Sequence, residues 1–341
     1  MKVIVDDKIP YIRGQIERLA NEVAYLPGSA ISKSDVQDAD VLIVRTRTRC
    51  DQALLEGTSV RLIVTATIGY DHIDTAYCEA HGIQWTNCPG CNANSVCQYV
   101  HHALEATGFL KPSYTIGVVG VGHVGSLVAA DLEACGMKVL RCDPPKEAEQ
   151  KNFNCQCSMV NGKWLDGKYL DLPTIQAEAD IITFHTPLTK EGPWATYHMA
   201  DEQFFRHLLH RPLIINASRG GVVDNEALLW ALNEGLIADA VIDTWEGEPD
   251  LNRELLEQVV IGTPHVAGYS ADGKANATRM SLEAVAQFMG VDFKPQIDLP
   301  DAPCLSVETL LDDSRQLKLH PDRFEEMRGN YPVRRERLCK V

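Results

Sequence analysis

Short apolar runs alternate with longer amphipathic stretches along most of this chain. In its first part the runs cover residues 2–7, 41–45, 61–67 and 82–87, and they are rich in β-branched residues. Runs of this length, bounded by turn-forming residues, are typical of buried strands. Because helix-length segments separate them, we expect parallel βαβ units in an α/β fold.

A second series of apolar runs follows a helical stretch at residues 94–108, which Asn94 or Ser95 can cap and Gly108 can end. Amphipathic segments of helical length separate these runs as well. Six strands in this rhythm predict a doubly wound parallel sheet. The predicted strands are residues 115–120, 138–143, 180–185, 212–218, 238–243 and 259–263.

Two regions depart from this rhythm. Residues 150–172 contain Asn161-Gly162 between two short runs, which predicts an inserted β-hairpin on the surface. After a helical pattern at residues 279–290, the chain ends in a proline-containing stretch and a strongly charged tail. This last part is interpreted as a small appended module.

Composition excludes several classes of function. The formal net charge of −15 argues against nucleic acid or an anionic membrane as the main partner. No apolar run reaches the ~18 residues that a membrane span needs, and the amino terminus does not resemble a secretory signal. The eleven cysteines are scattered and odd in number, which favours reduced thiols in a cytoplasmic protein.

Metal binding is not expected from the cysteine spacing. Cys88 and Cys91 form one close pair and Cys155 and Cys157 another, but a zinc site needs about four ligands in workable spacing. The first pair has no obvious second pair, and the C-x-C spacing of the other is unusual for zinc. We therefore predict no metal.

A glycine-rich turn predicts the cofactor site. Gly120, Gly122 and Gly125 form a G-x-G-x-x-G motif that follows a predicted strand and opens a predicted helix, whose first residues include His123 and Val124. Glycines permit the tight turn, the approach of a pyrophosphate and close helix–strand packing, while the amides at the helix start attract phosphate.

The end of the next predicted strand indicates which dinucleotide is bound. Asp143 is placed to accept hydrogen bonds from both ribose hydroxyls, and its charge would repel a 2′-phosphate. The cofactor is therefore predicted to be NAD rather than NADP. Arg141, two residues earlier, moderates this preference.

Three ionisable residues follow later strands of the same series. Arg219, Glu248 and His265 are all expected at the carboxyl ends of parallel strands, where ligands of open sheets collect. His265 can accept a proton from an alcohol, Glu248 can orient the imidazole, and Arg219 can grip a carboxylate through two parallel bonds. Each residue also has an ordinary structural explanation, but together they indicate a dehydrogenase of hydroxy acids.

Several motifs support this interpretation by resemblance. The segments TATIGYDHID, GVVGVGHVG, FHTPLT, NASRGGVVD, DTWEGEP and TPHVAGYS resemble those of D-isomer-specific 2-hydroxyacid dehydrogenases, over roughly residues 40–275. The resemblance implies a Rossmann domain of residues 95–266 inserted into a flavodoxin-like substrate domain of residues 1–94 and 267–285. It further implies that the active site lies in the cleft between these domains.

The same resemblance assigns further residues. It implies nicotinamide contacts at Asp243 and Gly268 and a position near the cofactor ribose at Thr186. Within the family, the chain most resembles the branch that oxidises a phosphorylated four-carbon acid. This resemblance implies substrate contacts at Thr46, Thr67 and Tyr269. Residues 286–341 resemble that branch's dimerisation module, so a homodimer is expected. The insert at 150–172 and the stretch 295–320 match poorly.

The arginines at 45, 47 and 49 gain a function from this context. They directly follow a predicted strand in an otherwise acidic chain, and a doubly anionic substrate needs a second cationic group beside Arg219. Arg45 is the first choice for the phosphate. Because the family pattern also places Thr46 on the substrate, we expect the chain to leave regular strand geometry here, and alternation cannot rank the three arginines.

Two other functions stay open from sequence. One is a 2-hydroxyacid dehydrogenase that acts on phosphoglycerate or glyoxylate. The other is an NAD-sensing binding protein without turnover, since this fold also serves as a nucleotide-gated interaction module.

Overall fold

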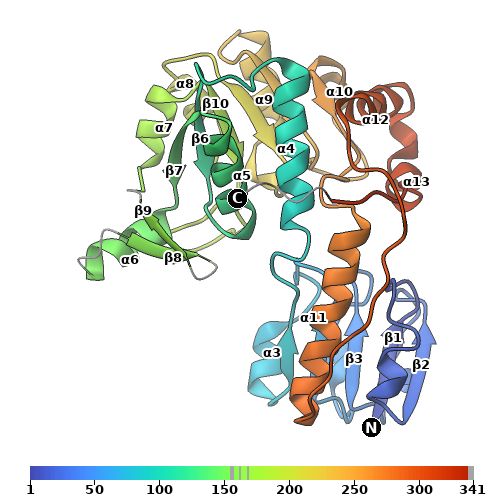
Figure 1. Cartoon of the computed structure of the whole chain (residues 1–341). Helices are drawn as coiled ribbons and strands as arrows, with labels where there is room; N and C mark the ends of the chain where they lie inside the picture. Colours follow the sequence, from blue (N-terminus) through green and yellow to red (C-terminus); the bar gives the residue numbers. More distant parts are fainter. Residues whose placement is uncertain (154–156, 161–162, 167–168, 337–341) are drawn as a thin grey trace. The chain divides into compact units, whose positions relative to one another are not determined.

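The computed structural model describes residues 1–153, 157–160, 163–166 and 169–336, and its contacts divide the chain into two compact units. Unit 1 comprises Met1–Asn92 and Ser270–Ala302, and unit 2 comprises Ala93–Tyr269 and Pro303–Val341. Unit 2 therefore interrupts unit 1 along the chain, as the predicted fold class requires (Figure 1).

Unit 1 contains a five-stranded parallel sheet in the order β2-β1-β3-β4-β5. This is the flavodoxin-like order. The sequence pattern missed β2, whose residues are only partly buried at the sheet edge and so show no continuous apolar run. The strands are β1 (Lys2–Asp6), β2 (Glu22–Leu26), β3 (Val41–Val44), β4 (Leu62–Thr65) and β5 (Gln84–Thr86).

Apolar layers cover both faces of this sheet. Successive residues of β1, such as Val3 and Ile4, belong to different core clusters because successive strand side chains point to opposite faces. The long helix α11 supplies one layer through Leu282 and Val285 and packs on β4. The helices of unit 1 are η1 (Ile16–Arg18), α1 (Lys33–Val36), α2 (Gln52–Leu55), α3 (Thr75–Ala80) and α11 (Ala271–Met289).

Unit 2 contains a six-stranded parallel sheet in the order β13-β12-β11-β10-β6-β7. The chain moves to β7 on one side of β6 and to β10 on the other, so the topological switch point lies between β6 and β10. Ligands of doubly wound sheets bind at this point. The strands are β6 (Thr115–Val119), β7 (Lys138–Cys142), β10 (Ile181–Phe184), β11 (Leu213–Asn216), β12 (Asp239–Ile242) and β13 (Ile261–Gly262).

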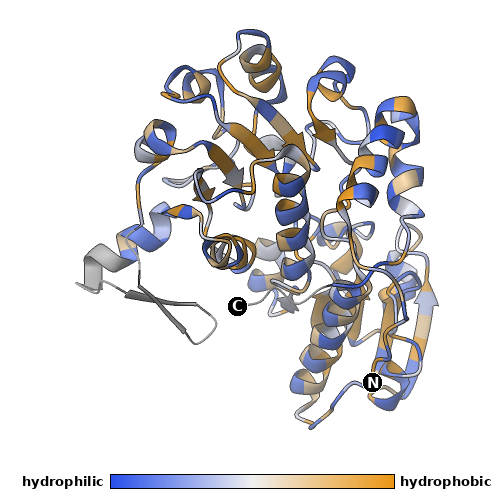
Figure 2. Ribbon diagram, turned by 45° about the horizontal axis from the view of Figure 1, so that its top comes forward, coloured by the Kyte–Doolittle hydropathy of each residue, from blue (hydrophilic) through white to orange (hydrophobic). Residues whose placement is uncertain are grey.

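Helices cover both faces of the second sheet and enclose two apolar clusters. The strands are mainly hydrophobic, whereas the helices carry hydrophobic and hydrophilic residues on different sides (Figure 2). α4 and α5 pack against each other. The helices are α4 (Ala93–Thr107), α5 (His123–Ala134), α6 (Pro144–Phe153), α7 (Leu172–Glu178), α8 (Glu202–Arg206), η2 (Gly220–Val222), α9 (Asn225–Asn233) and α10 (Arg253–Gln258).

The predicted hairpin is confirmed in its strands. β8 (Cys157–Val160) and β9 (Lys163–Asp166) pair in antiparallel register. The predicted turn at Asn161-Gly162 lies outside the described residues. Within the described ranges no helix has both the length and the apolar content that crossing a bilayer requires.

The C-terminal segment, residues 303–336, packs within unit 2 and contains α12 (Val307–Leu319), η3 (Pro321–Arg323) and α13 (Phe324–Gly329). α12 contacts α4 and the edge strand β13. There the hydroxyl of Ser314 accepts a 3.0 Å hydrogen bond from the amide of Gly262, so the helix satisfies a backbone donor of the sheet edge. Leu317 and Phe324 join the core of unit 2.

The domain boundaries anticipated from sequence stay predictions. The contacts place residues up to Ala302 with unit 1 and residues from Pro303 with unit 2. They therefore divide the proposed module of residues 286–341 between the two units.

A buried carboxyl links α12 to the end of the C-terminal segment. Tyr331 donates a 2.7 Å hydrogen bond to Asp313. Burial raises the pKa of Asp313 to about 6, and the carboxylates of Asp312 and Asp243 add to this, while Tyr331 and Arg334 oppose it. A carboxyl with a raised pKa binds more protons in the folded than in the unfolded chain, so it destabilises the fold once it ionises.

We expect Asp313→Asn to stabilise the protein above pH 6, because the amide can still accept from Tyr331 and never ionises. The gain should reach up to about 3 kcal/mol and vanish as the pH falls toward ~4, where the unfolded carboxyl also becomes protonated. Urea unfolding of both proteins at several pH values measures this. Asp322→Asn, at an exposed carboxylate of the same segment, is the control and should show no such gain. A gain that does not depend on pH would contradict the assignment.

Candidate active site

The glycine-rich turn after β6 has a separate structural reason for each glycine. Gly120 has φ +86°, and a Cβ there would lie 2.7 Å from the carbonyl of His185. A Cβ on Gly125 would lie 1.9 Å from the carbonyl oxygen of Gly120, so only glycine lets α5 approach the turn. A Cβ on Gly122 would meet no atom within 4 Å among the described residues, which leaves space beside the turn for a ligand.

The start of α5 and the end of β7 complete this turn. Gly122 is the N-cap, so the amides of His123 and Val124 belong to the first turn of a twelve-residue helix, where free amides attract anions. Asp143 accepts hydrogen bonds from the amide of Val121 at 2.8 Å and from that of Lys146 at 3.2 Å. Its carboxylate is thus fixed beside the glycine turn.

Arg141 is committed elsewhere. Two of its nitrogens donate to both carboxylate oxygens of Glu133 at 2.7 Å. A guanidinium held in this way is not free to bind a 2′-phosphate, which is consistent with the preference for NAD.

Buried polar atoms without partners lie after two strands of this sheet. The hydroxyls of Thr186 and Thr244 and the Nδ1 atom of His185 have no hydrogen-bond partner within the described part of the chain. Burial lowers the pKa of His185 to about 3, so this imidazole is neutral. Unsatisfied buried groups are rare in folded proteins. Thr186 follows β10, at the switch point, and Thr244 follows β12, two strands away.

Asp243, at the end of β12, organises the loop that contains His265. This carboxylate is 1% exposed. Its Oδ1 accepts from the hydroxyl of Thr263 at 2.6 Å and from the amide of Val266 at 2.8 Å, and its Oδ2 accepts from the amide of Ala267 at 3.0 Å. The contact with nicotinamide expected for Asp243 stays a prediction, and only Oδ2 retains clear capacity for it.

His265 and Glu248 form a hydrogen-bonded pair. The Nδ1 atom of His265 lies 2.8 Å from Oε2 and 3.1 Å from Oε1 of Glu248, and the amide of Trp245 donates to Oε1 at 2.8 Å. Burial alone would raise the pKa of Glu248, but the hydrogen bond and charge of His265, the Trp245 amide and the charge of Arg328 together lower it. An ionised Glu248 places the proton on Nδ1 and leaves Nε2 able to accept one.

His265 has an uncommon backbone conformation. Its φ of +57° lies in the left-handed region, which is unfavourable for a side chain other than glycine. Such conformations persist where the surroundings impose them, often at functional sites. Here the hydrogen bonds of Asp243 on both sides of His265 impose it.

Arg219 follows β11, which lies next to β12 in the sheet. Its Nη1 donates to its neighbour's carbonyl, that of Ser218, at 2.8 Å, and it makes no ion pair with any acidic group among the described residues. The loop is fixed by Asn216, whose side chain donates to the Arg219 carbonyl at 3.0 Å and accepts from Ser218. The guanidinium is therefore positioned and available for an anion.

The loops that carry Arg219 and Glu248 touch each other. A Cβ on Gly220 would lie 2.0 Å from the carbonyl oxygen of Trp245. His198 connects the same loops, because its Nε2 lies 2.6 Å from Glu246 and its Nδ1 3.4 Å from Asp224. Contacts between these loops, together with the pair between His265 and Glu248, thus join the three predicted catalytic residues in one connected network within unit 2.

The predicted arginine turn of unit 1 is present, and β3 ends at Val44, one residue before the end of the predicted run. Arg45 donates through Nε and Nη2 to both oxygens of Asp6 at 3.1 and 3.2 Å, and Asp6 is fully buried. Thr46 and Arg47 lie exposed in the turn, and Arg49 pairs with Asp51 at 2.9 Å. The prediction that the chain leaves regular strand geometry is confirmed, but sequence did not reveal that Asp6 offsets the charge of Arg45.

Thr67 lies in a chain of hydroxyl contacts after β4. Its hydroxyl is 2.7 Å from that of Thr65 and donates to the carbonyl of Gly69 at 2.9 Å. His72 Nε2 lies 3.1 Å from the same Thr65 hydroxyl, and burial lowers the pKa of His72. The structure thus assigns Thr67 a fixed rotamer, while its contact with substrate stays a prediction.

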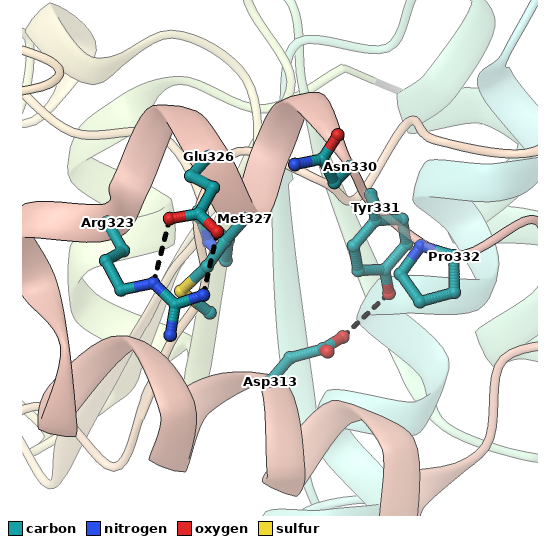
Figure 3. A pocket seen from close by; sticks show the side chains of 8 residues that line it. Asp313, Arg323, Glu326, Met327, Asn330, Tyr331 and Pro332 are labelled. Carbon is teal, nitrogen blue, oxygen red and sulfur yellow. Dashed lines mark hydrogen bonds and ion pairs between the residues drawn. The ribbon is translucent and has the colours of Figure 1, made fainter.

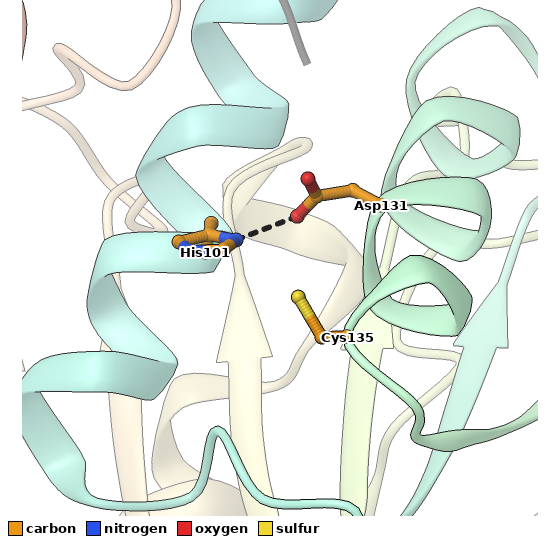
Figure 4. Close-up of side chains that lie close together, drawn as sticks. All are labelled: His101, Asp131 and Cys135. Carbon is orange, nitrogen blue, oxygen red and sulfur yellow. Dashed lines mark hydrogen bonds and ion pairs between the residues drawn. The ribbon is translucent and has the colours of Figure 1, made fainter. Parts of the chain in front are cut away.

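Two groups of side chains could offer metal ligands among the described residues. In the first group, Nδ1 of His101 on α4 lies 2.7 Å from Oδ2 of Asp131 on α5, near Cys135 at the end of α5 (Figure 4). The second group comprises His198, Asp224 and Glu246. Both groups fall short of the four ligands typical of structural zinc. The absence of a metal remains a prediction from sequence.

The two cysteine pairs give no support to zinc. Burial raises the pKa of the Cys88 thiol to about 11, and this thiol donates to carbonyls of Thr65 and Ala277. Zinc binding requires a thiolate, which these surroundings disfavour. Cys155 lies outside the described residues.

The C-terminal segment contributes Arg328, which the sequence analysis did not identify as a site residue. Tyr269, a predicted substrate contact close to Gly268, accepts a 3.1 Å hydrogen bond from Nε of Arg328. Nη1 of Arg328 lies 3.9 Å from Oε2 of Glu248. The only sequence feature that could have pointed to Arg328 is its position at the start of the segment RGNYPVRRE. No local pattern connects this segment with Glu248.

Comparisons with known proteins agree with this geometry. The D-isomer specific 2-hydroxyacid dehydrogenase, NAD binding domain family matches residues 105–267. Erythronate-4-phosphate dehydrogenase of Bacteroides thetaiotaomicron is 50% identical, with 98% of this chain and 97% of that protein covered. The enzyme of the same name from Escherichia coli is 41% identical, with 98% and 92% covered.

This chain belongs to the erythronate-4-phosphate dehydrogenases, within the D-isomer-specific 2-hydroxyacid dehydrogenase family. Membership confirms the resemblance inferred from the sequence motifs. It also confirms that unit 2 contains the NAD-binding domain of this family.

Solved structures confirm the fold. The D-lactate dehydrogenase of Aquifex aeolicus, solved with NAD and lactic acid, is 25% identical, has a TM-score of 0.65 and covers 85% of this chain and 96% of its own. A glyoxylate reductase from Paecilomyes thermophila has a TM-score of 0.69 at 20% identity and covers 86% of this chain and 97% of its own.

We expect Gly220→Ala to destabilise the protein by about 1–3 kcal/mol, because the new methyl group would displace the Trp245 carbonyl and separate the two loops. Gly221→Ala is the matched control. Its Cβ would lie 3.3 Å from the ring of Tyr197, which is 44% exposed and can move, so its cost should stay below about 1 kcal/mol. Thermal unfolding of the variants measures both. Equal stability of the two would mean that the loops do not approach this closely.

Proposed function

We propose that this chain oxidises 4-phospho-D-erythronate to (R)-3-hydroxy-2-oxo-4-phosphooxybutanoate with NAD, a step of pyridoxal 5′-phosphate biosynthesis. The main support is the pairing of His265 with Glu248, in a chain 50% identical to an enzyme named for this substrate. The loop of Glu248 contacts the loop of Arg219, whose guanidinium has no acidic partner in the described residues. A base, an orienting carboxylate and a cation are the groups that oxidation of a 2-hydroxy acid requires.

In this proposal the proton transfer belongs to His265. Its Nδ1 donates to Glu248, so Nε2 accepts the proton of the substrate hydroxyl, and Glu248 stabilises the imidazolium that forms. Arg219 binds the substrate carboxylate and polarises the neighbouring oxygen. When bound, NAD supplies the acceptor for the hydride that leaves carbon.

The cofactor is held by the groups around the switch point. Gly120, Gly122 and Gly125, with the amides of His123 and Val124, hold the pyrophosphate, and Asp143 holds the ribose. Thr186, Asp243 and Gly268 contact the remaining parts. The open space beside Gly122 and the unpaired Thr186 hydroxyl support this assignment.

The substrate phosphate is assigned to the arginine turn of unit 1. Arg45 is held rigidly by Asp6 and retains Nη1 for a ligand, and Arg47 adds a cation in the same turn. Thr46, Thr67 and Tyr269 complete the contacts with substrate.

We also propose a cytoplasmic homodimer. Leu311, Leu319 and Val333 of the C-terminal segment are 44%, 63% and 54% exposed, and large exposed apolar side chains on one segment suit an interface. The thiols of Cys50, Cys78, Cys88 and Cys142 form no disulfide in the described structure, which suits a reducing compartment.

Addition of 4-phospho-D-erythronate and NAD to the purified protein should generate NADH absorbance. We expect kcat/KM for 3-phosphoglycerate and D-lactate to be lower by about 100-fold or more, because the site would leave polar groups unpaired with these acids. Faster turnover of a shorter or unphosphorylated acid would favour the neighbouring dehydrogenases. NAD binding without turnover of any acid would favour the sensing protein.

A catalytic variant serves as the control for that assay. His265→Asn should lose about 10³-fold in kcat while NADH still binds, because only the proton acceptor is removed. Turnover that persists in this variant would come from a contaminating enzyme or from another base.

Substitutions in the arginine turn test the phosphate assignment. Arg45→Gln, which keeps a donor for Asp6, and Arg47→Ala should each raise KM for 4-phosphoerythronate by about tenfold or more. KM for unphosphorylated erythronate should change little. Arg49→Ala, at the exposed arginine paired with Asp51, is the matched control. Equal losses for both acids would remove the turn from the phosphate site.

A further inference from the structure

The C-terminal segment places two arginines against the loop of residues 263–269, here called the His265 loop. Arg334 is 4% exposed, and its Nη2 lies 2.9–3.1 Å from the carbonyls of Ala267 and Val266 and the hydroxyl of Ser95. These two carbonyls directly follow His265 in the chain. The segment is therefore bonded to the loop that carries the proposed base.

Arg328 contacts the other side of the same site. Nε of Arg328 donates to the Tyr269 hydroxyl at 3.1 Å, and Nη1 lies 3.9 Å from Glu248 and 3.8 Å from Glu325. Its side chain is 27% exposed, so solvent screens its charge only in part. One guanidinium thus faces both a proposed substrate contact and the carboxylate that orients the proposed base.

Packing on either side fixes the position of Arg328 in the segment. On one side Phe324, 1% exposed, is buried in the core of unit 2. On the other, Tyr331 is bonded to Asp313 (Figure 3). Because both anchors are buried or hydrogen-bonded, the short helix α13 presents Arg328 in a defined place.

We propose that Arg328 is a positioning residue of the dehydrogenase site, which holds the Tyr269 hydroxyl and sets the charge balance of the Glu248–His265 pair. This inference rests on the proposed function only in its kinetic consequences. Arg328 touches neither reacting atom in the described contacts, and it acts through Glu248 and Tyr269.

The electrostatic part follows from the charges around the pair. Arg328 favours the ionised form of Glu248 and opposes a second positive charge on His265. Glu325, on the same helix as Arg328, and the buried carboxylate of Asp243, on the other side of His265, act in the opposite sense on the imidazole. Arg328 therefore places a positive charge beside the pair that opposes formation of the imidazolium, against the carboxylates of Glu248, Glu325 and Asp243.

The geometric part depends on the shape of the guanidinium. Nε and Nη1 of one planar group point toward Tyr269 and Glu248 at the same time. A lysine keeps the charge but has a single ammonium, which cannot hold both partners in this arrangement. The conservative variant therefore separates the two parts of the proposal.

In Arg328→Gln we expect a change in the pH profile of kcat/KM for oxidation. Its acid limb, where activity falls as the pH decreases, should move to higher pH by about half a unit, because the charge that opposes the imidazolium is gone. Arg328→Lys should keep the limb in place and raise KM for the acid by about fivefold, through the lost bond to Tyr269. Arg323→Gln is the matched control. Arg323 is half exposed in the same segment and pairs with Glu326 (Figure 3), so its removal should change neither quantity.

An unmoved acid limb in Arg328→Gln overturns the electrostatic part, and an unchanged KM in Arg328→Lys overturns the geometric part. If Arg328→Gln does not fold, the lysine variant decides the proposal: a raised KM with an unmoved limb supports it, and wild-type kinetics overturn it. A limb that moves equally in Arg323→Gln shows a general effect of surface charge and also overturns it.

A spectroscopic measurement separates this inference from the proposed function. NMR of the protein labelled with [13Cε1]-histidine follows protonation of His265 without any substrate, and His265→Asn assigns the signal. In Arg328→Gln the midpoint of this titration should move to higher pH. A shifted midpoint in a protein that does not oxidise 4-phosphoerythronate would sustain the inference and remove the proposed function, whereas turnover with an unshifted midpoint would do the reverse.

Discussion

The buried carboxylate of Asp243 is the interaction on which the site in unit 2 depends. It ends β12 and receives the Thr263 hydroxyl and the amides of Val266 and Ala267, so it fixes the chain before and after His265. Burial raises the pKa of Asp243, so ionisation of this carboxyl has an energetic cost. Three donors aimed at one carboxylate offset this cost and hold His265 at a positive φ.

The same loop is supported from outside the sheet by the C-terminal segment. β13 comprises only Ile261 and Gly262, and a strand of this length at an edge has little stability of its own. Ser314 of α12 binds its backbone amide, and Arg334 binds the carbonyls that follow the loop's histidine. The edge that would otherwise be open is therefore covered by the chain's own terminus, and the covering element brings cations to the site.

Local sequence patterns predicted most of the architecture because strand length, strand-end position and glycine placement are local properties. The turn at Gly120 and the order of Arg219, Glu248 and His265 follow from these properties. β2 was missed because an edge strand with partly exposed residues lacks a continuous apolar run. α12 was also missed, although Leu310, Ser314 and Leu317 mark its buried face, because the buried serine interrupts the apolar periodicity.

The other features that the sequence could not show are ion pairs between side chains far apart in the chain. The partners of Arg45 and Arg328 lie in distant segments, and no spacing rule connects them. Asp6 neutralises Arg45, whereas Arg219 has no acidic partner in the described structure, so arginines of equal formal charge differ in what they can offer a ligand. The net charge of −15 opposes an anionic substrate only on average. Recognition is decided locally, by cations that the fold holds in place and by the donors that their protein partners leave over, such as Nη1 of Arg45.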